Sequence, residues 1–197
     1  ETHQGIYDLA FLNLVPNLTI LAPKDFLELE QMLSFAVTFE KPIAIRYPRG
    51  GEESFKFKQH EEINLGKAEI LKSGTDVTIL AIGKMVARAQ KIAEELKEEK
   101  IEAEVINARF LKPFDEEIFL TSIQKTKKLV TMEDGICQGG LATTTLECLQ
   151  KHGIQDIKMK HYGYPDEFIK QGKVEEIEEI YGLDLKTMKE GVCQLCR

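Results

Sequence analysis

A histidine near the amino terminus and a loop with two arginines are the residues of this 197-residue chain best suited to chemistry. His3 lies in the tetrapeptide THQG at residues 2–5, and Arg46 and Arg49 lie in RYPRG at residues 46–50. An imidazole can move a proton near neutral pH once a partner fixes its ring. The alternative is that His3 lies in a frayed terminus and binds nothing, because chain ends are seldom held.

The two arginines carry different expectations. A guanidinium fork suits carboxylate and phosphate groups. Arg46 still belongs to a predicted strand, so we favour its pairing with a local carboxylate. Arg49 lies on the loop, where Pro48 restricts the backbone and Gly50 frees it. For Arg49 we therefore favour the binding of an anion.

Other polar residues are better explained by structure than by chemistry. Glu133 and Asp134 follow a predicted strand and could form a site, but capping of the next helix is the favoured interpretation. The glycines that follow fit neither the dinucleotide nor the P-loop signature. We expect His60 to be a solvated surface residue. His152 and His161 are isolated, and a structural or exposed position is favoured over a ligand role.

Composition and charge exclude several classes of protein. The net charge of −7 and the pI near 5.3 argue against a nucleic-acid-binding protein. No apolar run is long enough to span a membrane, and no leader pattern opens the chain, so we expect a cytoplasmic protein. Four cysteines suggest no disulfide framework. Cys193 and Cys196 have the spacing of a redox pair or half a metal site, but two thiols on a mobile tail are favoured.

Periodicity predicts the elements that must position these residues. Strands at 18–22 and 42–46 flank a helix from Phe26 to Phe39, capped by Asp25, which makes a βαβ unit. The apolar stripe of this helix contains Phe26, Leu29, Met32, Leu33, Ala36 and Val37. A polar linker occupies residues 51–62. The RYPRG loop follows the carboxyl end of a parallel strand, where sites in such sheets lie.

The second domain, residues 63–197, alternates strands and helices. The predicted class is α/β, with a mostly parallel sheet and helices on both faces. Strands are expected at 68–71, 76–82, 101–106, 128–132 and 157–160, and helices at 85–99, 115–124 and about 140–149, with further helices from 174 and 185. A βαβ unit with no further strands of its own would leave an edge and apolar surface exposed.

Seven motifs, read together, resemble one known family. They are THQG at 2–5, DLA at 8–10, APKD at 22–25, RYPRG at 46–50, NARFLKP at 107–113, TMED at 131–134 and YPDEFI at 164–169. In order and spacing they resemble the carboxyl-terminal part of the 1-deoxy-D-xylulose-5-phosphate synthase family, which belongs to the transketolase-like thiamine diphosphate enzymes. The resemblance covers essentially the whole chain.

The resemblance implies a fold and an activity. Residues 1–50 would be the carboxyl-terminal part of the pyrimidine-binding domain, and residues 63–197 the transketolase carboxyl-terminal domain. Enzymes of this family decarboxylate pyruvate and join the two-carbon unit to D-glyceraldehyde 3-phosphate, for isoprenoid, thiamine and pyridoxal synthesis. His3 would be the catalytic histidine near the pyruvate-derived group. Arg49 would bind the phosphate of glyceraldehyde 3-phosphate, and Arg46 and Tyr47 would support that loop.

The resemblance also implies thiamine diphosphate and Mg²⁺ as cofactors of the full-length enzyme. The Gly-Asp-Gly segment that holds them, and the glutamate that activates the aminopyrimidine, do not occur in this sequence. We therefore expect an inactive fragment that binds neither cofactor. The transketolase carboxyl-terminal domain, residues 63–197, would supply no catalytic group. It would pack against the other domains of the enzyme and build a homodimer. Residues 133–135 depart from the family's usual Glu-Glu-Asn.

Two alternatives remain open. One is a related enzyme, either the β subunit of a 2-oxo acid dehydrogenase or a transketolase half, although the two-arginine loop argues against it. The other is a non-catalytic dimerisation module that kept the fold and lost the chemistry. A partner chain carrying the cofactor segment would favour the first, and a short native chain without such a partner the second.

Overall fold

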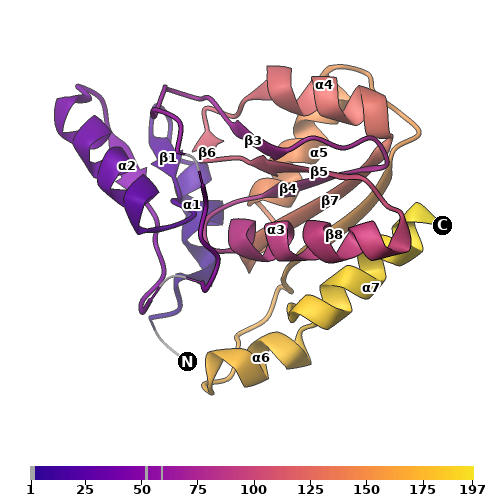
Figure 1. The fold of residues 1–197 in the computed structure, drawn as a ribbon. Helices are drawn as coiled ribbons and strands as arrows, with labels where there is room; N and C mark the ends of the chain where they lie inside the picture. Colours follow the sequence, from indigo (N-terminus) through magenta and orange to yellow (C-terminus); the bar gives the residue numbers. More distant parts are fainter. Residues whose placement is uncertain (1–2, 52, 59) are drawn as a thin grey trace.

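A computed structural model describes residues 3–51, 53–58 and 60–197 of the protein (Figure 1). Its larger sheet has five strands in the order β3-β5-β4-β7-β8, with β3 antiparallel to β5 and the other pairs parallel. The strands are β3 Glu69–Lys72, β4 Val77–Ala81, β5 Ala103–Asn107, β7 Lys128–Ile136 and β8 Lys158–Tyr164. The α/β class and the mostly parallel sheet are thus confirmed.

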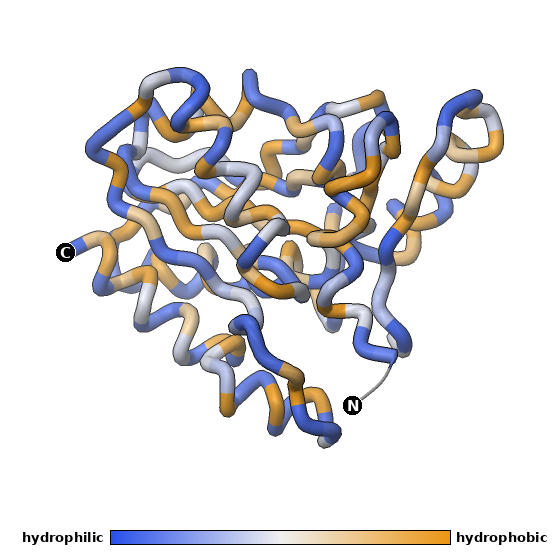
Figure 2. Tube along the Cα trace, turned by 180° about the vertical axis from the view of Figure 1, so that it is seen from behind, coloured by the Kyte–Doolittle hydropathy of each residue, from blue (hydrophilic) through white to orange (hydrophobic). Residues whose placement is uncertain are grey.

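Helices cover both faces of this sheet, as predicted. On one face lie α3 Met85–Glu95, its 3-10 extension η2 Leu96–Glu99, and α7 Leu185–Cys196, which share a core with β4 and β5. On the other face lie α4 Glu116–Thr126 and α5 Leu141–Lys151. A short helix, α6 Val174–Ile180, precedes α7. Apolar residues gather in the central strands (Figure 2), because strands buried on both faces need continuous apolar runs.

Residues 3–51 supply two strands of a smaller, three-stranded sheet, which the second domain completes. The elements in these residues are η1 Gly5–Tyr7, α1 Asp8–Asn13, β1 Thr19–Leu21, α2 Phe26–Thr38 and β2 Ile43–Ile45. β1 and β2 are parallel, which confirms the βαβ unit, and Asp25 caps α2 by accepting from the Glu28 amide at 2.8 Å. The third strand, β6 Phe110–Lys112, comes from the second domain and is antiparallel to β1. The sequence did not predict it.

The predicted apolar stripe of α2 is only partly buried. Met32 is buried, but Phe26, Leu33 and Val37 are 56%, 50% and 88% exposed. The helix packs on a sheet of only three strands, and these side chains keep much of their surface exposed. Exposed apolar surface of this kind is what an incomplete βαβ unit leads us to expect.

The carboxyl-terminal end is an ordered helix, which corrects the expectation of a mobile tail. Cys193 is buried and Cys196 half-buried, and both pack against the core under α3. The apolar face of α7 outweighs the tendency of a chain end to fray. Within the described part of the chain, no helix combines the length and the apolar character that crossing a membrane requires.

Candidate functional site

The two residues singled out from the sequence, His3 and Arg49, line one cavity of about 390 Å³. We call it the cationic cavity. Its walls come from the amino-terminal segment, the RYPRG loop, the end of β8 and the segment leading into α6. The lining residues are His3, Gln4, Ile6, Arg49, Tyr164, Ile169, Lys170, Gln171, Gly172, Val174 and Ile177. His3 and Gln4 thus share this cavity with Val174 and Ile177 of α6, far from them in sequence.

His3 is next to a well-anchored stretch of chain. The side-chain amide of Gln4 donates to the Ile169 carbonyl, and the Tyr7 hydroxyl donates to the Glu167 carbonyl at 2.8 Å. The Tyr7 ring meets that of Phe168 edge-on, with 6.4 Å between centroids. These contacts argue against a frayed terminus from Gln4 onward. Thr2, the first residue of the motif, lies outside the described residues.

Arg46 pairs with a carboxylate, as predicted, but its partner is distant in sequence. Its Nη1 lies 3.0 Å from Asp134 Oδ2, and its Nη2 donates to the Asp134 carbonyl at 2.8 Å. The ion pair therefore ties the end of β2 to β7. Lys84 Nζ lies 3.2 Å from the other Asp134 oxygen and 3.0 Å from Glu178. These ion pairs fix the strand end from which the RYPRG loop departs.

Arg49 stands apart from these ion pairs. It is exposed, and none of the described carboxylates lies within ion-pair distance of its guanidinium. It also lines a smaller cavity of about 250 Å³ beside Phe26, Tyr47 and Pro48. A guanidinium on a proline-restricted loop, with no acid neutralising it among the described residues, is suited to an external anion.

The cationic cavity does not fit a magnesium-bound diphosphate. Mg²⁺ needs oxygen ligands, and among its described lining residues there is no Asp or Glu. Among the described residues, one group could hold a metal ion, and it consists of Glu116, Cys148 and His152. Its sulfur and nitrogen donors do not suit Mg²⁺, and Lys151 Nζ already lies 2.8 Å from the Glu116 carboxylate.

The structure places the remaining histidines as follows. His60 is not a solvated surface residue, because the linker packs back over the start of α2 and puts its Nε2 2.6 Å from Asp25 Oδ2. His161 is structural, as expected, with its Nδ1 2.9 Å from the Thr131 hydroxyl, and burial lowers its pKa. His152 lies 2.8 Å from Glu116 at an exposed position.

Glu133 caps α5, as the favoured interpretation of the sequence stated. Its carboxylate accepts from the backbone amides of Leu141 at 2.9 Å and Ala142 at 3.0 Å. Burial raises its pKa to about 7, and the two amides oppose that rise. A Cβ on Gly140 would lie 2.0 Å from this carboxylate, so the cap requires glycine there.

A second group of charged residues lies fully inside the protein and was missed in the sequence. We call it the buried network, and it consists of Lys24, Glu28, Glu69, Asn107 and Arg109. The Glu28 carboxylate accepts from Lys24 Nζ at 3.0 Å, Asn107 Nδ2 at 2.9 Å and Arg109 Nε at 2.8 Å. Glu69 Oε2 lies 2.7 Å from Lys24 Nζ and 3.2 Å from Arg109 Nη2. The network joins the first segment to the second domain.

The sequence held a partial signal for this network. Three of its five residues, Lys24, Asn107 and Arg109, lie in the APKD and NARFLKP motifs. Glu28, however, reads as part of the polar face of a helix. Glu28 is buried because Asn107 and Arg109 of the second domain pack against it and donate hydrogen bonds to its carboxylate.

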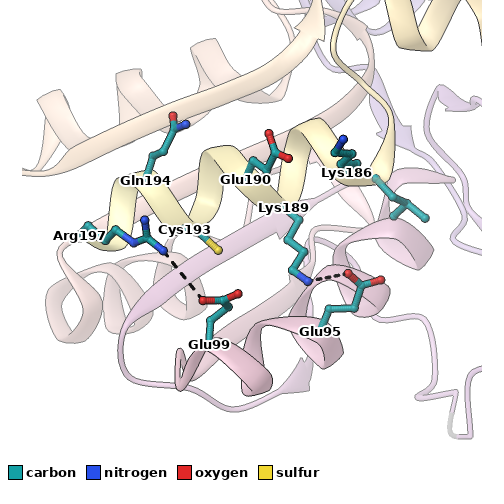
Figure 3. A pocket seen from close by; sticks show the side chains of 9 residues that line it. Glu95, Glu99, Lys186, Lys189, Glu190, Cys193, Gln194 and Arg197 are labelled. Atoms are coloured by element: carbon teal, nitrogen blue, oxygen red, sulfur yellow. Dashed lines mark ion pairs between the residues drawn. The ribbon is translucent and has the colours of Figure 1, made fainter.

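A larger cavity of about 540 Å³, between α7 and the α3–η2 helix, has balanced charge (Figure 3). Lys189 Nζ lies 3.0 Å from Glu95, and Arg197 Nη2 lies 4.0 Å from Glu99. Burial raises the pKa of both Cys193, which lines this cavity, and Cys196. Protonated thiols are poor nucleophiles, so this cavity is not a candidate catalytic site.

Two domain families match the chain. Residues 66–188 match the family described as "Transketolase, C-terminal domain", and residues 1–51 match "Transketolase, pyrimidine binding domain". Among curated proteins, the 1-deoxy-D-xylulose-5-phosphate synthase 1 of Geobacter metallireducens is 41% identical over 93% of this chain. That of Halothermothrix orenii is 38% identical over 99%. The chain spans only 29% and 31% of these relatives.

Solved structures share the fold. A chain described as "Split gene transketolase, inactive beta4 tetramer" is 31% identical, with a TM-score of 0.90, over 98% of this chain and 63% of its own length. A transketolase variant from Pichia stipitis has a TM-score of 0.70 over 99% of this chain and 27% of its own. Its 16% identity supports the fold alone.

Proposed function

Since this chain belongs to the transketolase family, we propose that it forms the carboxyl-terminal part of a 1-deoxy-D-xylulose-5-phosphate synthase. The enzyme would condense pyruvate, with loss of carbon dioxide, with D-glyceraldehyde 3-phosphate. The names of the relatives, at about 40% identity over nearly the whole chain, support this choice within the family.

The observation that carries the proposal is the charge of the cationic cavity. The protein has a net charge of −7, yet the described residues that line this cavity include Arg49 and Lys170 and no acid. A cavity with this excess of cations selects a phosphorylated substrate. Arg49 binds the phosphate of glyceraldehyde 3-phosphate through its guanidinium fork.

His3 lines the same cavity as Arg49. Its imidazole holds or moves a proton at the oxygen atoms of the reacting carbons, because its ring nitrogens can both donate and accept a hydrogen bond. Because the described lining of the cationic cavity has no Asp or Glu to hold Mg²⁺, we assign the binding of thiamine diphosphate and Mg²⁺ to other parts of the enzyme. The chain by itself is then inactive.

The proposal also covers how the protein assembles and where in the cell it lies. The split transketolase chain of the same fold is described as a β4 tetramer, so chains of this shape can associate with copies of themselves. The partner we propose is a second copy, in a cytoplasmic homodimer. The exposed apolar face of α2 supports burial of this region in the assembled enzyme.

A second candidate is one half of a split transketolase, favoured by the TM-score of 0.90 to such a chain. The intact mass of the native protein separates the two. A mass roughly three times that of this chain, expected for a three-domain protein, supports the synthase. A mass near 22.4 kDa, together with a partner chain that carries the cofactor site, supports the split enzyme.

The roles are tested by steady-state kinetics on the full-length enzyme. Arg49→Ala removes a charge-assisted contact worth about 1.5–3 kcal/mol, so the KM for glyceraldehyde 3-phosphate should rise about 10- to 100-fold. The KM for pyruvate should change little. Arg197→Ala, at the end of α7, is the matched arginine control. Equal changes for both substrates would contradict the assignment.

His3→Ala is the second arm of the same assay. It should lower kcat, because the variant keeps the phosphate contact of Arg49 and loses the proton-transfer group. An unchanged kcat would remove the catalytic role of His3 and leave that of Arg49 untouched.

A further inference from the structure

We propose that Lys170 is a second phosphate-binding side chain of the cationic cavity, supplied by the second domain. The inference rests on the proposed function and names a residue that determines specificity at the same site. The sequence led us to expect that this domain packs and dimerises without contributing to a site. The segment after β8, residues 165–173, changes that expectation because it forms one wall of the cavity.

This segment is held against the residues that carry His3. Glu167 and Ile169 accept, through their carbonyls, the hydrogen bonds from Tyr7 and Gln4. The side chain of Ile169 is buried in the core shared by α3 and α7. Lys170 follows directly after this anchored residue, so its backbone is fixed at the rim while its side chain remains exposed.

The charge of Lys170 is available to a ligand. Among the described carboxylates, none lies within 4.0 Å of its ammonium. Two other lysines, Lys84 and Lys173, are each paired with a glutamate of α6. Lys84 lies 3.0 Å from Glu178, and Lys173 lies 3.7 Å from Glu176. The nearest acid in sequence, Glu167, accepts instead from the Tyr181 hydroxyl at 2.6 Å.

Arg49 and Lys170 divide the recognition of a phosphate between them. A guanidinium fork orients two oxygens, and an ammonium adds a point charge that needs no fixed direction. The cavity volume of about 390 Å³ falls within the roughly 300–1,000 Å³ of small-molecule sites. Because the two cations lie on different domains, a bound phosphate also links those domains.

The test compares phosphorylated and unphosphorylated acceptors in the full-length enzyme. Lys170→Ala should raise the KM for D-glyceraldehyde 3-phosphate about three- to tenfold, the effect of losing one partly exposed charged contact. The KM for D-glyceraldehyde, which lacks the phosphate, and the KM for pyruvate should stay the same. Lys170→Arg should restore most of the lost affinity. Lys173→Ala, three residues further on, is the matched control.

Two outcomes would overturn the inference. One is an unchanged KM for the phosphorylated acceptor, and the other is an equal rise for both acceptors, which would indicate a structural role. If the unaltered enzyme makes no 1-deoxy-D-xylulose 5-phosphate, the proposed function fails instead. In that case, inorganic phosphate is titrated into this chain and the amide chemical shifts are recorded. This titration tests whether Lys170 binds phosphate. Shifts around the cavity that weaken in Lys170→Ala support the site, and their absence in the unaltered chain rejects it.

Discussion

The buried network and the cationic cavity use the same residue types for opposite purposes. In the buried network, Lys24 and Arg109 are each within 3.0 Å of a glutamate oxygen, and their side chains are almost fully buried. In the cavity, Arg49 and Lys170 are exposed, and the described residues provide no acid to neutralise them. Arginine or lysine identity alone therefore does not reveal a role.

What separates the two regions is where the compensating charge comes from. Buried cations must be paired, because an uncompensated charge in the interior costs several kcal/mol. Cations at a solvated cavity need no acidic partner from the protein, because water solvates them. A bound ligand can then supply the negative charge. The comparison predicts large losses of stability in the first region and losses of substrate affinity, without unfolding, in the second.

The largest effect on stability is expected at Glu28, the centre of the buried network. Glu28→Gln removes one of the two negative charges that neutralise Lys24 and Arg109, the other being that of Glu69, but keeps the shape of the side chain. Breaking a buried pair in this way should lower the free energy of unfolding by about 3–5 kcal/mol, measured by urea denaturation. Glu30→Gln, on the exposed face of the same helix, should change it little. A loss below about 1 kcal/mol would show that the network does not hold the domains together.

A pH effect of intermediate size is expected at Glu133, a buried carboxylate held by backbone amides. Its pKa is about 7 in the folded chain, against an ordinary value of 4.5. Between these values the folded protein binds more protons than the unfolded chain, so stability should fall as pH rises from about 4.5 to about 7. Each pKa unit corresponds to about 1.4 kcal/mol. Glu133→Gln should flatten this part of the curve, and an unchanged slope would assign it to another group.

The smallest effect is expected at the exposed pair of Lys67 and Glu117, whose side chains are both more than half exposed. Solvent and salt screen such a pair, and its long side chains lose freedom by forming it. Glu117→Gln should therefore leave the urea midpoint unchanged within error, although the nitrogen–oxygen distance of 3.1 Å falls within the 2.7–3.2 Å range of the ion pairs in the buried network. A clear shift would mean that distance matters more than burial.

Local patterns predicted most of the fold. Apolar runs and helical spacing located the parallel strands and the helices on both faces, and Asp25 and Glu133 were recognised as caps. These signals depend on residues close in sequence. β6 was missed because Phe110–Lys112 is short and pairs with a strand from the other domain. Periodicity located the apolar stripe of α2, and the incomplete βαβ unit led us to expect the exposed apolar surface that Leu33 and Val37 show.

The candidate site was predictable in part. His3 and Arg49 were chosen from residue type and family motif, and the structure brings them to one cavity. Lys170 was not chosen, because a lysine in a polar segment has no distinguishing local pattern. Arg46 was expected to find a carboxylate, but Asp134 could not be named as its partner. Such pairings depend on how two segments distant in sequence pack against each other. The periodicity of residues along one sequence carries no information about that packing.

The pairing of β6 with β1 has a consequence for the order in which this protein is made. Ile20 pairs with Lys112 and Leu21 with Phe110, so the first sheet lacks a strand until the ribosome has passed the middle of this chain. The early segment must wait, with its apolar residues exposed, for a strand synthesised much later. The small sheet therefore closes only after residue 112 has been synthesised.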